Sequence, residues 1–274
     1  MKKSLVLLLS VAMVAVMTAC GNAETGNQES TDAVVESTVE STVESTEESV
    51  VESTEPEAEE VAVMSYDEYV AAAIDEQVVV ETYVQAKQGW WEDKATMYTQ
   101  DENGAYFLYN MPCSEEDYAK LVKGTKIRVT GYKAEWEGEV EIVDGSFEIL
   151  EGEYIAEAMD VTEKLGSDEL IDFQNRFVAF KGMTVEPSVD ADGNEVPFLY
   201  NWDGSGQDGS DLYFNVSYNG QIYNFTVESY LCDNTTDVYN AVEALKIGDV
   251  VDMEGFLYWY AGVNPHITSI SVVE

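Results

Sequence analysis

"GDVVDMEGFLYWYAGVNPHI" (residues 248–267) repeats the layout of an earlier stretch, "GTKIRVTGYKAEWEGEVEIV" (residues 124–143). The two stretches have glycines at the same three offsets, namely Gly124, Gly131 and Gly138 in the first and Gly248, Gly255 and Gly262 in the second. Aromatic residues lie between the second and third glycine of each stretch. Such self-similarity predicts that one supersecondary unit is built twice in the chain.

The segments upstream of the two stretches also correspond. Each copy opens with a helical signal, "SYDEYVAAAIDEQ" from Ser65, where Glu68 completes a capping box, and "SDELIDFQN" from Ser167. A long strand follows, then a hairpin with Asn103-Gly104 or Asn219-Gly220 at its turn, then a helix, and then the glycine-flanked strands. This order is that of the OB-fold, a five-stranded barrel with a helix between its third and fourth strands.

We therefore predict a mainly β protein with two tandem OB-fold-like five-stranded barrels, each preceded by a short helix. The predicted domains are residues 64–152 and 153–274, after a signal peptide at residues 1–20 and a disordered tether at residues 21–63. The tether repeats Val-Glu-Ser-Thr four times and holds 13 acidic residues and no basic one. Such a composition cannot bury enough apolar surface to offset the entropy of ordering.

The N-terminus carries an export signal. Lys2 and Lys3 precede an apolar run at residues 5–16, which is too short to span a bilayer and has the proportions of a signal peptide. The run ends in "MTACG" (residues 17–21), which resembles the lipobox of bacterial lipoproteins, and the resemblance implies a diacylglycerol thioether on Cys20. Two acyl chains anchor a protein stably. We expect the protein on the extracellular face of the cell membrane, with the membrane as a partner through Cys20; the alternative is an ordinary cleaved signal.

With this motif, the stretch at residues 248–267 and "LYNWDGSGQDGSDLYF" (residues 199–214), the chain resembles a group of bacterial surface lipoproteins of the Gram-positive type that carry tandem OB-like domains. No reaction is assigned to that group. The resemblance thus implies architecture and location, and it implies no chemistry.

The aromatic residues of the loops are the candidate ligand site. OB-folds bind ligands on the face of strands 2 and 3, framed by the loops after strands 1 and 4. All five tryptophans lie in or beside those loops, and exposed rings rimmed by polar residues often mark a contact surface. The predicted ligand-binding residues are Trp90, Trp91, Trp136, Trp202, Tyr258, Trp259 and Tyr260. The alternative is that several of these rings plug the barrel ends, because tryptophan is usually largely buried.

The charge of the chain restricts the expected ligand. The whole chain has 54 acidic and 13 basic residues; without the 13 acids of residues 21–63 and the two lysines of residues 1–20, residues 64–274 keep 41 acidic and 11 basic residues, a net charge of −30. Nucleic-acid binders need a cationic groove, so we predict no nucleic-acid partner. We predict a non-catalytic binding module for a glycan, cell-wall or protein partner; the alternative is a structural or assembly protein of an envelope complex.

The sequence offers little for catalysis or for a cofactor. His266 is the only histidine and lies in a strand-like run, which excludes triads and zinc sites that need several histidines. The acidic loops that begin at Asp190 and Asp203 match no calcium motif, so we interpret them as turns and predict no metal and no cofactor. Cys113 and Cys232 occupy equivalent positions in the two copies, and we expect both to be buried free thiols.

Overall fold

The computed structural model describes residues 62–273, so the predicted signal peptide, Cys20 and almost all of the predicted tether lie outside the described residues. No helix in the described part is long and apolar enough to cross a membrane. The described chain forms two closed five-stranded β-barrels with the strand order of the OB-fold, one after the other in sequence. The predicted fold class is thereby confirmed.

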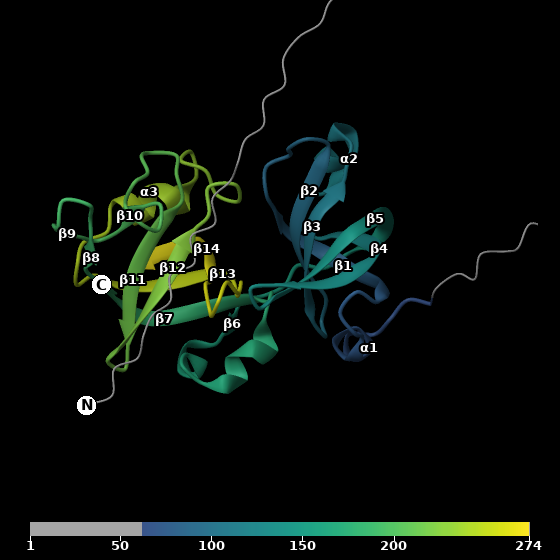
Figure 1. Ribbon diagram of the computed structural model, residues 1–274, viewed down its shortest axis with the longest axis horizontal. Coiled ribbons are helices and arrows are strands. Elements are labelled where there is room, and N and C mark those ends of the chain that lie inside the picture. The colour runs from purple at the N-terminus through teal and green to yellow at the C-terminus, as the bar shows by residue number, and fades with distance from the viewer. Residues whose placement is uncertain (1–61, 274) are drawn as a thin grey trace, which may run out of the picture. The chain divides into compact units, whose positions relative to one another are not determined.

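The first barrel has the hydrogen-bonded order β1-β2-β3-β5-β4 and closes through pairing of β1 with β4 (Figure 1). Strands β3 and β5 pair in parallel, and the other neighbours pair antiparallel. Its elements are α1 (Tyr66–Ala71), β1 (Gln77–Lys87), β2 (Lys94–Gln100), β3 (Ala105–Pro112), α2 (Glu115–Lys120), β4 (Thr125–Trp136) and β5 (Glu139–Glu153).

The second barrel repeats this order with β7, β11, β12, β14 and β13, and it closes through pairing of β7 with both β11 and β13. Strands β12 and β14 form the parallel contact. Its elements are β6 (Met159–Asp160), the 3-10 helices η1 (Thr162–Lys164) and η2 (Asp168–Phe173), β7 (Phe177–Glu186), β8 (Ser188–Val189), β9 (Glu195–Val196), β10 (Leu199–Tyr200), β11 (Leu212–Tyr218), β12 (Gln221–Val227), α3 (Asp237–Glu243), β13 (Val250–Phe256) and β14 (His266–Val272).

The two opening helices differ in their caps. In α1 the Ser65 side chain accepts a hydrogen bond from the backbone N–H of Glu68, and the Glu68 carboxylate accepts one from the Ser65 N–H at 2.8 Å, so the predicted capping box is present. In the second copy Ser167 makes no side-chain cap bond, and the segment forms the 3-10 helix η2. An α-helix without a cap leaves more of its first N–H groups unsatisfied, which favours the tighter 3-10 turn in so short a segment.

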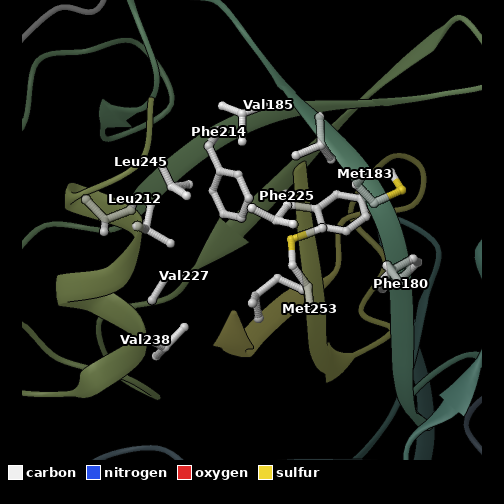
Figure 2. Packing of buried hydrophobic residues seen from close by; sticks show 14 of the residues in the cluster. Phe180, Met183, Val185, Leu212, Phe214, Phe225, Val227, Val238, Leu245 and Met253 are labelled. Carbon is white, nitrogen blue, oxygen red and sulfur yellow. The ribbon is translucent and has the colours of Figure 1, made fainter. Parts of the chain in front are cut away.

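Each barrel encloses its own apolar core. Alternating strand residues of the first barrel, such as Val78, Val80 and Met97, are fully buried together with Leu121 at the end of α2. Figure 2 shows Phe214, Phe225 and Met253 pointing into the space that the strands of the second barrel enclose.

Two of the three repeated glycine pairs have the same structural role in both barrels. Gly124 and Gly248 have φ of +94° and +92°, a backbone conformation that favours glycine, and each lies just before the fourth strand. Gly131 and Gly255 lie at β-bulges, where an added Cβ would approach the backbone of the fifth strand to 2.9 and 2.2 Å. A side chain does not fit at either bulge, so glycine is needed there. The first glycine of each stretch thus marks the start of the fourth strand, and the second marks its bend.

Candidate functional site

The turn at residues 137–138 between β4 and β5, with its flanking residues Trp136 and Glu139, contacts the loop at residues 257–265 between β13 and β14. The rings of Trp136 and Tyr260 are 5.1 Å apart between centroids. The backbone N–H of Trp259 donates to the Glu139 carboxylate at 2.9 Å, and the Ala261 N–H donates to the Glu137 carbonyl at 2.7 Å. Each of the two repeated segments thus forms part of the contact between the barrels.

A buried aromatic cluster supports this junction from below. Tyr98 of β2 stacks on Phe256 of β13 with centroids 4.3 Å apart and an angle of 10° between the planes, and Phe107 of β3 packs beside them. The Tyr98 hydroxyl hydrogen-bonds His266 Nδ1 at 2.9 Å. These contacts join side chains of both barrels over a buried apolar area, so they hold the site on two rigid scaffolds.

An open pocket of about 720 Å³ lies at this junction. It is lined by residues of both barrels, with aromatic walls and several carboxyl groups. We call it the junction pocket; its lining residues are Gln88, Gly89, Trp91, Glu92, Lys94, Thr96, Phe107, Tyr109, Asn110, Trp136, Glu141, Glu228, Tyr230, Tyr258 and His266.

The structure brings only some of the seven predicted ligand-binding residues together. Trp91, Trp136 and Tyr258 line the junction pocket, and Tyr260 contacts the ring of Trp136. Trp91 and Trp136 are 70% and 53% exposed. A ligand-binding role for these four residues stays a prediction.

The other three predicted residues lie outside the pocket lining. Trp90 is half-buried and donates its indole N–H to the Cys113 carbonyl at 2.9 Å. Trp259 packs on the core of the second barrel and against Gly138, where an added Cβ would lie 2.9 Å from its Cδ1. Trp202 follows β10 and is 75% exposed. Of these three, only Trp259 packs on a barrel core, as the barrel-plugging alternative predicts.

Sequence reasoning missed several pocket residues. Tyr109 of β3 is exposed in a strand that is otherwise mostly buried, and a polar-facing tyrosine in an apolar run is a usable signal. Tyr230 follows β12 and is 70% exposed, but its neighbourhood in sequence carries no motif. Glu228 follows β12 directly, and its sequence context predicts a solvated carboxylate at the end of a strand. In the structure Gln88 of the other barrel donates to both of its carboxylate oxygens at 3.0 Å.

Three carboxyl groups at the pocket, those of Glu228, Glu141 and Glu139, are largely or fully buried. Burial raises the pKa of Glu228 to about 8, the Asp211 carboxylate adds to that shift, and the hydrogen bond from Gln88 opposes it. Burial also raises the pKa of Glu141, which lines the pocket. Glu139 is fully buried, and burial raises its pKa well above the ordinary carboxyl value. At neutral pH Glu228 is therefore mostly protonated.

His266 is neutral in this setting. Burial lowers its pKa to about 3. Its Nδ1 is 3.9 Å from Glu228 Oε2, but with a protonated carboxyl and an uncharged imidazole this is a contact between two neutral groups at pH 7. His266 begins β14, as its strand-like run predicts.

The remaining sequence predictions concern thiols and acidic loops. Cys113 and Cys232 are both buried and unpaired, as expected. The Asp190 carboxylate accepts backbone hydrogen bonds from Asp192 and Asn194, and Asp203 accepts one from Ser205, which is turn chemistry within each loop.

Comparison with known proteins gives a likeness of fold only. Neither a protein-family model nor a curated protein sequence matches the chain. Solved structures match over most of its length: a murine DNA-binding protein bound to double-stranded DNA has 9% identity and a TM-score of 0.35, covering 72% of this chain and 95% of that one. The Ifi202 HINa domain in complex with 20-base-pair double-stranded DNA has 9% identity and a TM-score of 0.32, covering 73% and 97%. A deletion mutant of the single-stranded DNA-binding protein from Thermus aquaticus has 13% identity and a TM-score of 0.23, covering 72% and 94%.

This comparison contradicts two predictions made from the sequence. Binding of a glycan, cell-wall or protein partner, with its assembly-protein alternative, has no counterpart among these structures, and they are described as DNA-binding proteins, against the predicted absence of a nucleic-acid partner. Both predictions are therefore withdrawn. The prediction about nucleic acid rested on net charge, which is a property of the whole surface and does not describe one groove. At identities of 9 to 13% the likeness assigns no ligand to this chain.

Proposed function

We propose that the protein binds a small organic ligand in the junction pocket through contacts with its aromatic walls. The observation that carries this proposal is that rings from both barrels, exposed to solvent, converge on one concavity of about 720 Å³. Small-molecule sites are typically concave, aromatic-lined and of roughly 300–1,000 Å³, with a few polar groups that fix orientation.

The exposure of the rings supports binding rather than packing. Trp91 and Tyr230 are each 70% exposed and lie on different barrels, next to β1 and β12. Leaving such large apolar surfaces in water has a free-energy cost that packing against a ligand would remove. The backbone N–H of Gly89 donates to the Tyr230 carbonyl at 2.7 Å, so the two aromatic segments are held beside each other before any ligand arrives.

We propose that the site binds without catalysis. The one histidine of the sequence, His266, is too weak a base to take up a proton near neutral pH, because burial lowers its pKa to about 3.

We also propose that the protein is exported and anchored by lipid on Cys20, on the strength of the lysines, apolar run and lipobox-like motif of residues 1–21. Mass spectrometry of the mature protein from its native membrane would show a diacylglyceryl group on an N-terminal Cys20. A Cys20→Ser variant is expected in the culture medium or with its signal uncleaved, and normal membrane retention of this variant would contradict the anchor.

The binding proposal is tested by ligand-observed NMR with a fragment set that contains neutral, cationic and anionic molecules. Fragments are expected to bind the wild type and the Trp202→Ala variant. With Trp91→Ala and Trp136→Ala, most of the NMR binding signal of the same fragments should be lost. Trp202 is the matched control, because it is exposed to a similar degree and does not line the pocket. Absence of any binding fragment, or equal binding to all three variants, would contradict the proposal.

A single-stranded oligonucleotide is the second arm, since its bases are able to stack on tryptophan and tyrosine rings. Ten-nucleotide oligo(dT) is titrated at low and high salt against the same three variants. Binding that falls steeply with salt and is unaffected by Trp91→Ala and Trp136→Ala would identify a polynucleotide surface elsewhere and would replace the small-ligand proposal.

A further inference from the structure

We infer that the ligand of the junction pocket is an organic cation, a quaternary ammonium or a protonated amine, which the aromatic walls surround and which the carboxylate of Glu228 neutralises. This inference rests on the proposed function and names the ligand class for the same site. It follows from three features of the pocket: rings without a cation, carboxyl groups without a cation, and a buried carboxyl that is able to release a proton.

The rings of the pocket receive no cation from the protein itself. Residues 62–273 show six cation–π contacts, and their rings belong to Tyr118, Phe177, Tyr83, Tyr69, Phe173 and Tyr66. Within the described chain none of these contacts involves Trp91, Tyr109, Trp136, Tyr230 or Tyr258. Six basic side chains thus lie over other aromatic rings, and among the pocket rings Trp91 and Tyr230 stay the most exposed, each at 70%, whereas Tyr258 stacks on His266. Tryptophan and tyrosine faces are the surfaces that attract quaternary ammonium groups.

The carboxyl groups of the pocket also differ from those elsewhere. Glu81 of β1 pairs with Lys126 at 2.6 Å and with Arg128 at 2.9 Å, and the hydrogen bond from Lys126 and that from Arg128 lower its pKa. Glu228 is more deeply buried, yet the groups it meets are the neutral amide of Gln88 and the neutral imidazole of His266. A buried carboxyl that lacks a positive partner is costly when ionised, and a bound cation would supply that partner.

The charges that face the site favour a cation over an anion. Glu92 and Glu141 also line the pocket, and Lys94 is the one basic residue among its lining residues. The titratable groups around Glu228 on the neighbouring elements are Asp211, His266, Cys232 and the hydroxyls of Tyr98, Tyr213 and Tyr258. None of these groups is positively charged at neutral pH, so an anionic ligand would find no positive partner on this side of the pocket.

Cation binding at this position is coupled to a proton. The neutral Glu228 carboxyl loses its proton to solvent as the ammonium group takes its place, and the ammonium–carboxylate pair forms in the pocket. No bond of the ligand breaks, and the proton released is the one that Glu228 still holds, which is about nine tenths of a proton for each cation bound at pH 7 and about one tenth at pH 9. Because the pKa of Glu228 is about 8, roughly one tenth of the free protein carries this carboxylate at pH 7 and roughly nine tenths at pH 9. The affinity for a permanent cation should therefore rise with pH over this range, by up to about tenfold.

The experiment compares two probes of the same shape. Choline carries a quaternary ammonium, and 3,3-dimethyl-1-butanol has a carbon in place of its nitrogen and no charge. Each probe is titrated into the full-length protein, and indole fluorescence and calorimetry report binding at pH 7 and pH 9. We expect choline to bind at least tenfold more tightly than the alcohol at pH 9, and its affinity to fall toward pH 7 while that of the alcohol stays constant.

Two variants separate the charge effect from a loss of structure. Glu228→Gln replaces the carboxyl by a neutral amide of the same size that does not ionise. This variant should abolish the pH dependence of choline binding. Glu92→Gln changes an exposed carboxyl at the pocket and should weaken choline about twofold without any effect on the alcohol, whatever the folding of the first variant. Trp202→Ala should bind both probes as the wild type does.

The outcomes distinguish the two levels of the argument. Equal affinity for choline and the alcohol would overturn the cation inference and leave the aromatic pocket as a binding site. If the affinity of the wild type for choline does not change with pH, the carboxylate of Glu228 does not neutralise the bound cation. Binding of neither probe, together with an empty fragment screen, would overturn the proposed function as well.

Discussion

Replacement of Glu228 by glutamine should flatten part of the pH dependence of stability. The carboxyl of Glu228 is buried between the barrels, where its pKa rises from 4.5 to about 8. The folded state thus holds this proton more tightly than the unfolded state. The stabilisation from the neutral acid is complete below the unfolded pKa near 4.5 and is lost as the pH rises through about 8. The glutamine side chain is neutral throughout and is still able to bond with Gln88.

The magnitude follows from the two pKa values. Linkage over a pKa range of 4.5 to about 8 gives a loss of about 4 kcal/mol in the unfolding free energy between pH 5 and pH 9, with about 2.5 kcal/mol of it lost by pH 7. Glu139 and Glu141 have raised pKa values too and lower the stability in the same direction, so the wild-type curve alone does not isolate Glu228. The difference between the wild type and Glu228→Gln does.

The assay is urea unfolding followed by tryptophan fluorescence and by circular dichroism at pH 5, 7 and 9. Relative to the wild type, the variant should become more stable by about 4 kcal/mol between the first and the last pH. If the two proteins keep a constant difference in unfolding free energy at all three pH values, Glu228 does not change its protonation on folding. The pocket electrostatics described above would then be wrong.

Three further substitutions test the junction and the first barrel, each by urea unfolding at pH 7. Gly138→Ala should lower the unfolding free energy more than Gly220→Ala does. Both positions have positive φ, which costs about 1–2 kcal/mol for alanine, but only at Gly138 would the methyl carbon lie 2.9 Å from an indole carbon of Trp259. Equal losses for the two variants would show that this contact does not restrict position 138. Tyr98→Phe leaves Nδ1 of His266 buried without its hydroxyl partner and should cost about 1–3 kcal/mol, whereas a neutral effect would show that water reaches the ring. Lys133→Met removes the ammonium group that donates to three carbonyls at the end of α1, so a loss of about 1–3 kcal/mol is expected, and an unchanged midpoint would mean that α1 adds nothing to the stability of the barrel.

The fold was predictable because its signals are local. Glycines mark the start and the bulge of each fourth strand, and the capping box of Ser65 and Glu68 marks the first helix. Asn219-Gly220 forms a two-residue turn with positive φ at both residues, whereas Asn103-Gly104 ends a four-residue loop in which Asp101 accepts both backbone N–H groups. Each of these signals depends on backbone conformation within a few residues, which the sequence states directly. The second opening helix was the weaker prediction, because Ser167 has the residue type of a cap and does not make the cap bond.

The candidate site was predictable only in part, because burial and pairing are not local. Trp91 and Trp136 were found from their place in the loops, but the sequence places Trp259 and Trp202 in equivalent loops, and the structure packs one and separates the other from the pocket. Glu228 shows the limit most clearly. Its sequence context predicts a solvated carboxylate, whereas burial in the folded chain raises its pKa to about 8, against the opposing effect of the hydrogen bond from Gln88.

The asymmetry between the two repeated loops explains why two copies form one pocket. In the first copy β4 and β5 are joined by a two-residue turn in which Glu137 and Gly138 both have positive φ, as in a type I′ hairpin. So tight a turn cannot fold back over its own barrel, and Trp136 at its base stays exposed. The second copy has nine residues between β13 and β14, enough for Trp259 to pack on its own core and to lie over Gly138. The longer loop thus fixes the junction through its tryptophan, and the shorter one leaves its tryptophan at the pocket.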